Sequence, residues 1–227
     1  MSQENKILQR LKNIEQEIII ACKTAKREKE NVKLIVVSKT IEPNYICEVA
    51  KYGQVYFGEN KVQEAVKKWP KIKSLYPKVR LHMIGPLQSN KVKDALRIFD
   101  VIETIDREKI AIELKNNIKK YQLFPKLYVQ INVGEEKQKN GCLPIKAKSF
   151  IDECIAMGLN ITGVMGIPPF NTEPSPYFAL LTKIAQECNL KNISMGMSND
   201  FEKAIYLGAT SIRIGTKIFG ERIIQKS

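Results

Sequence analysis

Eight short apolar runs, each followed by a longer amphipathic segment, constrain the fold of this chain more than any other feature of its sequence. The runs lie at residues 34–37, 55–57, 81–84, 101–104, 127–133, 161–165, 193–195 and 211–214. Several are apolar at consecutive positions, which is typical of strands that are covered on both faces in a parallel sheet. The segments between them carry apolar residues three or four positions apart, as a helix with one buried face requires.

Eight strand–helix units predict an α/β fold, a single (β/α)₈ or TIM barrel. A doubly wound open sheet is the alternative, because a strand count from pattern alone can be wrong by one. Before the first run, residues 3 to about 29 carry apolar side chains at helical spacing, which predicts an extra N-terminal helix packing on the barrel. No linker rich in Gly, Pro or Ser interrupts the chain, so residues 1–227 are expected to form one domain.

Composition excludes several classes of protein and site. No apolar run approaches the roughly 20 residues that a membrane span needs, and no signal peptide opens the chain, so we expect a cytoplasmic protein without a membrane segment. Five cysteines without a C-x-x-C pair argue against a disulfide framework and a zinc site. The single histidine, His82, excludes most zinc enzymes, and we expect no bound metal.

The net charge of +13 is compatible with nucleic-acid binding, but the distribution of the charge argues against it. The basic excess is almost all lysine and is spread along the whole chain. Proteins that bind nucleic acid usually concentrate arginine with interleaved aromatic residues. We therefore expect no nucleic-acid partner, and a binder of nucleic acid or of an acidic partner is kept only as an alternative.

Functional groups of a TIM barrel follow the strands, where the βα loops form the open mouth. Lys39 comes directly after the first apolar run, so its amine is expected at this mouth. A lysine there suits Schiff-base formation with an aldehyde, because burial disfavours the ammonium form. The alternative is a lysine that ends a strand and only extends into solvent.

Two segments with glycine and hydroxyl residues follow the last two runs. Ser198 follows the seventh run, and Gly215 and Thr216 follow the eighth. In this barrel the loops after strands seven and eight, with a helix N-terminus, form the usual phosphate site. Gly215 lets the backbone approach closely, and the two hydroxyls can donate hydrogen bonds. The alternative is that Gly215 only makes a tight turn and Ser198 only caps a helix.

Arg213 lies two residues before Gly215, and it faces inward at the mouth if Gly215 does. A buried arginine needs a ligand acceptor or a carboxylate, for which Glu59 and Asp106 are the candidates; a purely structural ion pair is the alternative. His82 shares a strand face with Ile84, so it is either a core residue of the barrel interior or a wall of the pocket.

A strand-end lysine, a phosphate cradle and an interior arginine together match a phosphate cofactor that carries an aldehyde, such as pyridoxal 5′-phosphate (PLP). At these residues the sequence resembles the pyridoxal-phosphate homeostasis proteins, whose barrel is similar to the N-terminal domain of alanine racemase. The matching motifs, spread over residues 10–222, lie at residues 37–40 (Val-Ser-Lys-Thr), 57–64 (Phe-Gly-Glu-Asn-Lys-Val-Gln-Glu), 82–91 (His-Met-Ile-Gly-Pro-Leu-Gln-Ser-Asn-Lys), 130–133 (Gln-Ile-Asn-Val), 194–200 (Ser-Met-Gly-Met-Ser-Asn-Asp) and 213–220 (Arg-Ile-Gly-Thr-Lys-Ile-Phe-Gly).

The resemblance also implies roles for individual residues. Lys39 would form the internal aldimine with PLP, and Arg213 would face the pyridine nitrogen. The other residues implied in cofactor binding are Ser198, Gly215 and Thr216 at the phosphate, and Asn60, His82 and Met165 along the pocket. Leu81 and Gly166 depart from the family pattern, and both departures concern only the detail of the pocket.

The function implied by the resemblance is to bind, store or deliver PLP and to influence amino-acid and keto-acid balance, with no established catalytic reaction and no catalytic residue. Arg213 beside the ring nitrogen would disfavour pyridine protonation and weaken PLP as an electron sink. Alanine racemase has a further β-domain with a second acid/base tyrosine, and this chain of 227 residues is expected to have no counterpart.

The alternative is a PLP-dependent enzyme, such as a slow amino-acid racemase or a lyase, with Lys39 as the base. The expected partners are PLP itself and the apo forms of PLP-dependent enzymes, and the chain is expected to be a monomer.

Overall fold

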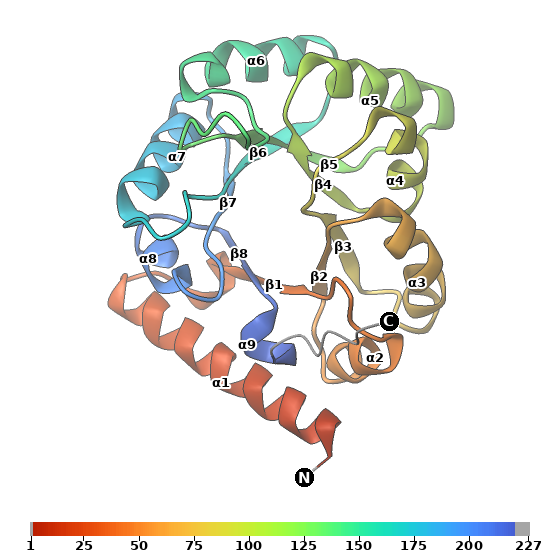
Figure 1. The fold of residues 1–227 in the computed structure, drawn as a ribbon, viewed down its shortest axis with the longest axis vertical. Coiled ribbons are helices and arrows are strands. Elements are labelled where there is room, and N and C mark those ends of the chain that lie inside the picture. Colours follow the sequence, from red (N-terminus) through yellow and green to blue (C-terminus); the bar gives the residue numbers. More distant parts are fainter. Residues whose placement is uncertain (1, 221–227) are drawn as a thin grey trace.

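The computed structural model describes residues 2–220, and within them eight parallel strands form a closed barrel (Figure 1). Each strand pairs with the next along the chain, and β1 closes the ring by pairing with β8, from Lys33 opposite Ser211 to Val36 opposite Ile214. The predicted TIM barrel is confirmed, because an open doubly wound sheet has no pairing between its first and last strands.

The observed strands begin or end within two residues of the predicted runs. They are β1 Lys33–Val37, β2 Tyr56–Glu59, β3 Arg80–Met83, β4 Val101–Ile105, β5 Lys126–Ile131, β6 Ile161–Gly166, β7 Asn192–Ser194 and β8 Ser211–Ile214. The helices of residues 2–220 are α1 Gln3–Thr24, α2 Pro43–Lys51, α3 Val62–Leu75, α4 Val92–Ile98, α5 Glu108–Tyr121, α6 Pro144–Ala156, α7 Ser175–Glu187, α8 Phe201–Tyr206 and α9 Thr216–Phe219. Within this range no helix is both long and apolar enough to cross a membrane.

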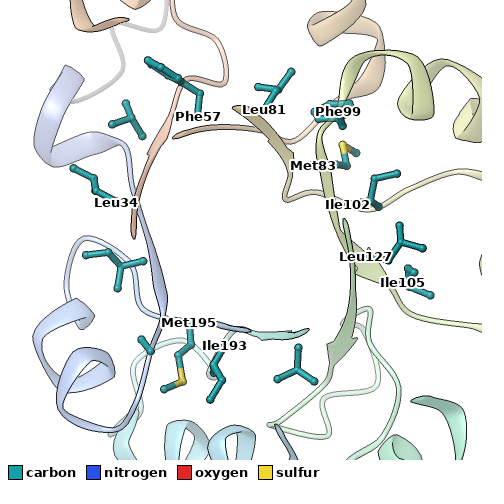
Figure 2. Packing of buried hydrophobic residues seen from close by; sticks show 14 of the residues in the cluster. Leu34, Phe57, Leu81, Met83, Phe99, Ile102, Ile105, Leu127, Ile193 and Met195 are labelled. Atoms are coloured by element: carbon teal, nitrogen blue, oxygen red, sulfur yellow. The ribbon is translucent and has the colours of Figure 1, made fainter. Parts of the chain in front are cut away.

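The main apolar core lies between the strands and the surrounding helices. Figure 2 shows Leu34, Met83 and Ile193 on the outer side of the strand ring, where the helices cover them. The alternate positions of the strands face the barrel interior, and several of these are polar and buried, among them His82, Glu103 and Arg213. Alternate positions of the apolar runs therefore form the outer core, while the inward positions carry both apolar residues, such as Ile35 and Met165, and polar groups.

The N-terminal helix α1 lies across the outside of the barrel next to α8, α9 and α2 (Figure 1). Its buried stripe is the predicted one: Ile7, Leu11, Ile14, Ile18 and Cys22. The spacing predicts a helix to about residue 29, but α1 ends at Thr24. Lys26 adopts a left-handed φ of 54°, and the Arg27 N–H donates to the Cys22 carbonyl, a pairing that closes a helix C-terminus.

Residue 1 and residues 221–227 lie outside the described residues, so the assignment of residues 1–227 to one domain stays a prediction. All five cysteines are free, two of them buried and three partly exposed. Among residues 2–220 no group of three His, Cys, Asp or Glu side chains is arranged to hold a metal ion.

Candidate functional site

A cavity of about 570 Å³ opens at the carboxyl ends of the strands. Its lining draws on the residues that follow β1, β2, β6, β7 and β8. Six of the predicted cofactor residues line it together: Lys39, Asn60, Ser198, Arg213, Gly215 and Thr216. They are up to 177 positions apart in sequence (216 minus 39), and the closed barrel brings them to one mouth.

Lys39 follows β1, and side chains of α3 form hydrogen bonds with the backbone on both sides of it. The Lys68 ammonium donates to the carbonyl of Ser38, at 2.9 Å. Thr40 has a left-handed φ of 63°, and its N–H donates to Glu64 Oε1 at 2.6 Å, which offsets the cost of that conformation. The two residues that flank Lys39 therefore each have a fixed partner.

A buried carboxylate, Glu59, lies beneath this turn. Its Oε1 accepts from the Ser38 hydroxyl at 2.7 Å and from Trp69 Nε1 at 3.0 Å, and it lies 2.8 Å from Lys68 Nζ. Burial raises the pKa of Glu59, against the lowering effect of the Lys68 charge and of these hydrogen bonds. The group connects β1, β2 and α3 below Lys39, and it is a positioning element outside the cavity lining.

The loop after β7 brings a hydroxyl next to the loop after β8. The Ser198 and Thr216 hydroxyl oxygens lie 3.2 Å apart, both on the cavity. Gly196 makes the turn with φ 87°, and the Asp200 carboxylate accepts from the Met197 N–H at 2.6 Å. Asp200 therefore stabilises the loop itself. These two hydroxyls, with the backbone at Gly215, form a small polar pocket that suits an oxyanion.

Gly215 is packed closely against β1. A Cβ at this position would lie 3.1 Å from the Cβ and from the carbonyl oxygen of Val37, tighter than ordinary contact. Any larger residue would push the start of α9, and with it Thr216, away from the mouth. Glycine is therefore needed at position 215 for packing against β1, in addition to the predicted close approach of a ligand.

The Arg213 guanidinium lies in the barrel interior at the floor of the cavity, with the residue only 4% exposed. Its Nη1 donates to the Ser194 hydroxyl at 2.6 Å, and its Nη2 donates to the Gly166 carbonyl at 3.0 Å. Burial lowers the pKa of Arg213, and the charge of Glu103 opposes that shift. Residues of β6 and β7 therefore hold the guanidinium in place, and Arg213 lines the mouth cavity.

Glu103 is the acid that balances Arg213. It is fully buried on β4, and its Oε2 accepts from the Ser194 hydroxyl at 2.6 Å. Its Oε1 lies 2.6 Å from Nδ1 of His82. Burial alone raises the pKa of Glu103, but the hydrogen bond and charge of His82, followed by the charge of Arg213 and the Ser194 hydroxyl, outweigh it and leave the pKa below its usual value.

The expectation that Glu59 or Asp106 balances Arg213 is wrong. Glu59 faces α3 and contacts Lys68, and Asp106 lies 2.6 Å from its neighbour Arg107. The physical reason is the direction of the side chains, since alternate residues of a strand face opposite sides. Glu103 lies inside the apolar run 101–104, and an isolated acid in such a run is the only feature of the sequence that distinguishes it.

Two of the predicted pocket residues lie elsewhere. Among the described residues, neither His82 nor Met165 lines the mouth cavity. Met165 is fully buried on β6, and His82 lies in the barrel interior below Arg213, at the other end of the chain of contacts through Ser194 and Glu103. This position fits the prediction of His82 as a residue of the barrel interior better than the alternative, a wall of the mouth cavity.

Curated proteins of known name resemble this chain over most of its length. The pyridoxal phosphate homeostasis protein of Aquifex aeolicus is 37% identical over 224 residues, which cover 94% of this chain and 97% of that protein. The human protein of the same name is 36% identical over 214 residues, covering 86% of this chain and 78% of that protein. This chain belongs to the pyridoxal phosphate homeostasis protein family. No family-level profile matches it.

Solved structures agree with this family and its barrel. PipY of Synechococcus elongatus, solved with PLP bound, superimposes with a TM-score of 0.80 at 31% identity and covers 94% of this chain and 100% of that one. The same protein without PLP gives a TM-score of 0.79 at 34% identity, over 84% of this chain and 93% of that one. Alanine racemase of Clostridium difficile, at 13% identity, shares the fold alone: its TM-score is 0.68, over 93% of this chain and 57% of the racemase.

Proposed function

We propose that this member of the pyridoxal phosphate homeostasis family binds PLP in the mouth cavity and takes part in intracellular PLP homeostasis. The observation that carries the proposal is the convergence of Lys39, the hydroxyl pair of Ser198 and Thr216, and Arg213 on one cavity. PLP needs an amine for its aldehyde, donors for its phosphate and a partner for its ring nitrogen, and the three groups supply one of each. The PLP-bound form of its relative PipY supports the same reading.

Lys39 is the anchor in this proposal. Its amine attacks the aldehyde carbon, and a C=N bond forms as water leaves, so the linkage reverses when water or another amine attacks the same carbon. The fixed backbone at Ser38 and Thr40 holds the lysine at one place on the rim. A reversible covalent anchor suits a protein that stores the cofactor and releases it to apo-enzymes.

The phosphate would lie between the loops after β7 and β8. Ser198 and Thr216 can each donate a hydroxyl hydrogen, and the backbone N–H groups around Gly215 add further donors. Asn60 stands on the wall of the same cavity. Met165 and His82 lie outside its lining, so any effect they have on the cofactor passes through other residues.

Arg213 argues for binding without efficient catalysis. A guanidinium at the ring nitrogen keeps that nitrogen unprotonated, so the ring accepts electrons from a substrate carbanion poorly. We propose a homeostasis protein without a catalytic residue of its own, acting in the cytoplasm as a monomer.

The test is reduction of the PLP-loaded protein with borohydride, followed by peptide mass spectrometry. A pyridoxyl group is expected on Lys39, together with loss of the visible absorbance of the imine. Lys39→Ala should lose both signals, whereas Lys61→Ala, an exposed lysine after β2, should keep them. A pyridoxyl group found on another lysine of the unmodified protein, with none on Lys39, would overturn the anchor.

The rival function is a slow racemase or lyase on the same barrel, with Lys39 as the base. Incubation of the PLP-loaded protein with L-alanine in deuterated water separates the two. A racemase must exchange the α-hydrogen, so exchange no faster than with free PLP supports the carrier. Exchange that is much faster, and that is lost in Lys39→Ala, would establish the enzyme.

A further inference from the structure

A second cavity, of about 470 Å³, lies at the opposite end of the barrel. It is lined by the first residues of five successive strands, β1 to β5: Lys33, Tyr56, Arg80, Val101 and Lys126. Among the described residues it shares no lining residue with the mouth cavity. We call it the lower cavity, and the proposed PLP site makes no use of it.

The lower cavity is strongly basic. Five cations line it, namely Lys33, Lys73, Arg80, Arg97 and Lys126, against one acid, Asp100. Asp100 is already engaged, since its Oδ2 lies 2.7 Å from Lys73 Nζ and accepts from the Leu81 N–H at 2.7 Å. Within residues 2–220 no ion pair joins the other four cations to an acid.

Two of these cations repel each other. Lys33 and Lys126 begin β1 and β5, and burial followed by the charge of Lys126 lowers the pKa of Lys33, with Glu103 acting the other way. Like charges gathered in one concavity raise the local concentration of anions and are stabilised when an anion arrives.

The floor of the lower cavity carries an unsatisfied polar atom. The His82 side chain is 3% exposed, and its Nδ1 lies 2.6 Å from the Glu103 carboxylate. A carboxylate accepts, so we assign a ring proton to Nδ1, which donates to Glu103. Nε2 is buried and has no hydrogen-bond partner among the described residues. A buried polar atom of this kind requires a partner, and His82 lines the cavity that would contain one.

We propose that the lower cavity is a second ligand site, for a phosphorylated small molecule that also carries a hydroxyl group. The phosphate is held by Lys33, Arg80 and Lys126, and the hydroxyl forms a hydrogen bond with Nε2 of His82. The volume suits a compound of nucleotide size, since ligand cavities range from about 300 to 1,000 Å³. A small molecule is favoured over a nucleic acid because the His82 side chain, which lines the cavity, is only 3% exposed.

The single histidine makes the site directly observable. Adenosine 5′-monophosphate (AMP) is titrated into the full-length protein while the imidazole resonances are followed by NMR, with adenosine as the probe that lacks phosphate. AMP is expected to shift the His82 signals with saturation, and adenosine to leave them unchanged. In Lys33→Gln/Lys126→Gln the apparent Kd should rise roughly tenfold or more.

The matched control is Lys148→Gln/Lys183→Gln, which removes the same charge from side chains 61% and 73% exposed on α6 and α7. It should bind AMP as the unmodified protein does, and near-ultraviolet circular dichroism confirms that both variants fold. The proposal is overturned if AMP leaves the His82 signals unchanged, or if the two double variants respond alike. Binding of an RNA octamer without binding of AMP would also overturn it and identify this face as a nucleic-acid surface. None of these outcomes depends on Lys39.

Discussion

Gly196 shows how one residue sets the geometry of the proposed phosphate site. Its φ of 87° turns the chain between β7 and the loop that carries Ser198, and a Cβ here would lie 2.5 Å from the Cβ of Ala204 on α8. The turn therefore needs glycine for two separate reasons, a left-handed backbone and the closeness of the neighbouring helix. Gly158 has a similar φ of 83° but nothing within 4 Å of its Cβ position, so it isolates the first reason.

Gly196→Ala is expected to destabilise the protein by about 2–4 kcal/mol, the sum of backbone strain and overpacking. Gly158→Ala should cost only about 1 kcal/mol, since it meets the strain alone. Urea unfolding measures both, and PLP affinity should fall in Gly196→Ala but not in Gly158→Ala. Equal losses of stability in the two variants would show that the contact with Ala204 is relieved by movement of the helix.

At the scale of the element, α1 supports the two helices that follow the proposed phosphate residues. It packs against α8, which comes after Ser198, and α9, which begins at Thr216. Arg27, just beyond α1, donates to the Ile205 carbonyl of α8 at 2.6 Å. The helix thus acts as a cover for this side of the barrel.

Leu11→Ala is expected to lower the free energy of unfolding by about 2–5 kcal/mol, because Leu11 is fully buried in the stripe of α1 and its loss leaves a cavity. Ile20→Ala on the same helix, where the side chain is 64% exposed, should change it by less than about 1 kcal/mol. Chemical denaturation of the two variants tests the assignment. A small effect for Leu11→Ala would mean that α1 is not integral to the folded barrel.

At the scale of the whole molecule, a buried chain of polar contacts spans the barrel from one cavity to the other. It runs from Arg213 at the mouth through Ser194 and Glu103 to His82 in the lower cavity, with each contact 2.6 Å long. The pKa of Glu103 is lowered in the folded protein. A carboxyl of this kind stabilises the fold above its unfolded pKa of about 4.3, and this contribution is lost as the pH falls through the folded value.

The melting temperature should therefore decline more steeply below about pH 4.3 in the unmodified protein than in Glu103→Gln, which cannot titrate at this position. Glu103→Gln is also expected to melt lower at pH 7, because Arg213 then lacks its buried counter-charge. Glu202→Gln, an exposed carboxylate on α8, is the control and should retain the steep decline. Parallel acid profiles for all three proteins would contradict a role for Glu103 in acid unfolding.

The sequence by itself determined an α/β fold of parallel strands, because eight apolar runs could be covered by the helical segments between them. The pairing of β1 with β8 then decided between the closed barrel and the open doubly wound sheet. The sequence also determined which residues reach the mouth, since Lys39, Ser198 and Gly215 each follow a strand, and the parallel strands of a closed barrel all end on one side. The buried stripe of α1 is also readable from the sequence, because apolar residues at helical spacing define it whatever surface they pack against.

Only the tertiary structure decided which groups meet inside the barrel. Glu103, Ser194 and Arg213 lie on β4, β7 and β8, and nothing in their spacing distinguishes Glu103 from Glu59 as the acid for Arg213. The position of His82 in the lining of the lower cavity also depends on neighbours distant in sequence. Periodicity is a local property, whereas the pairing of buried charges depends on the closure of the sheet.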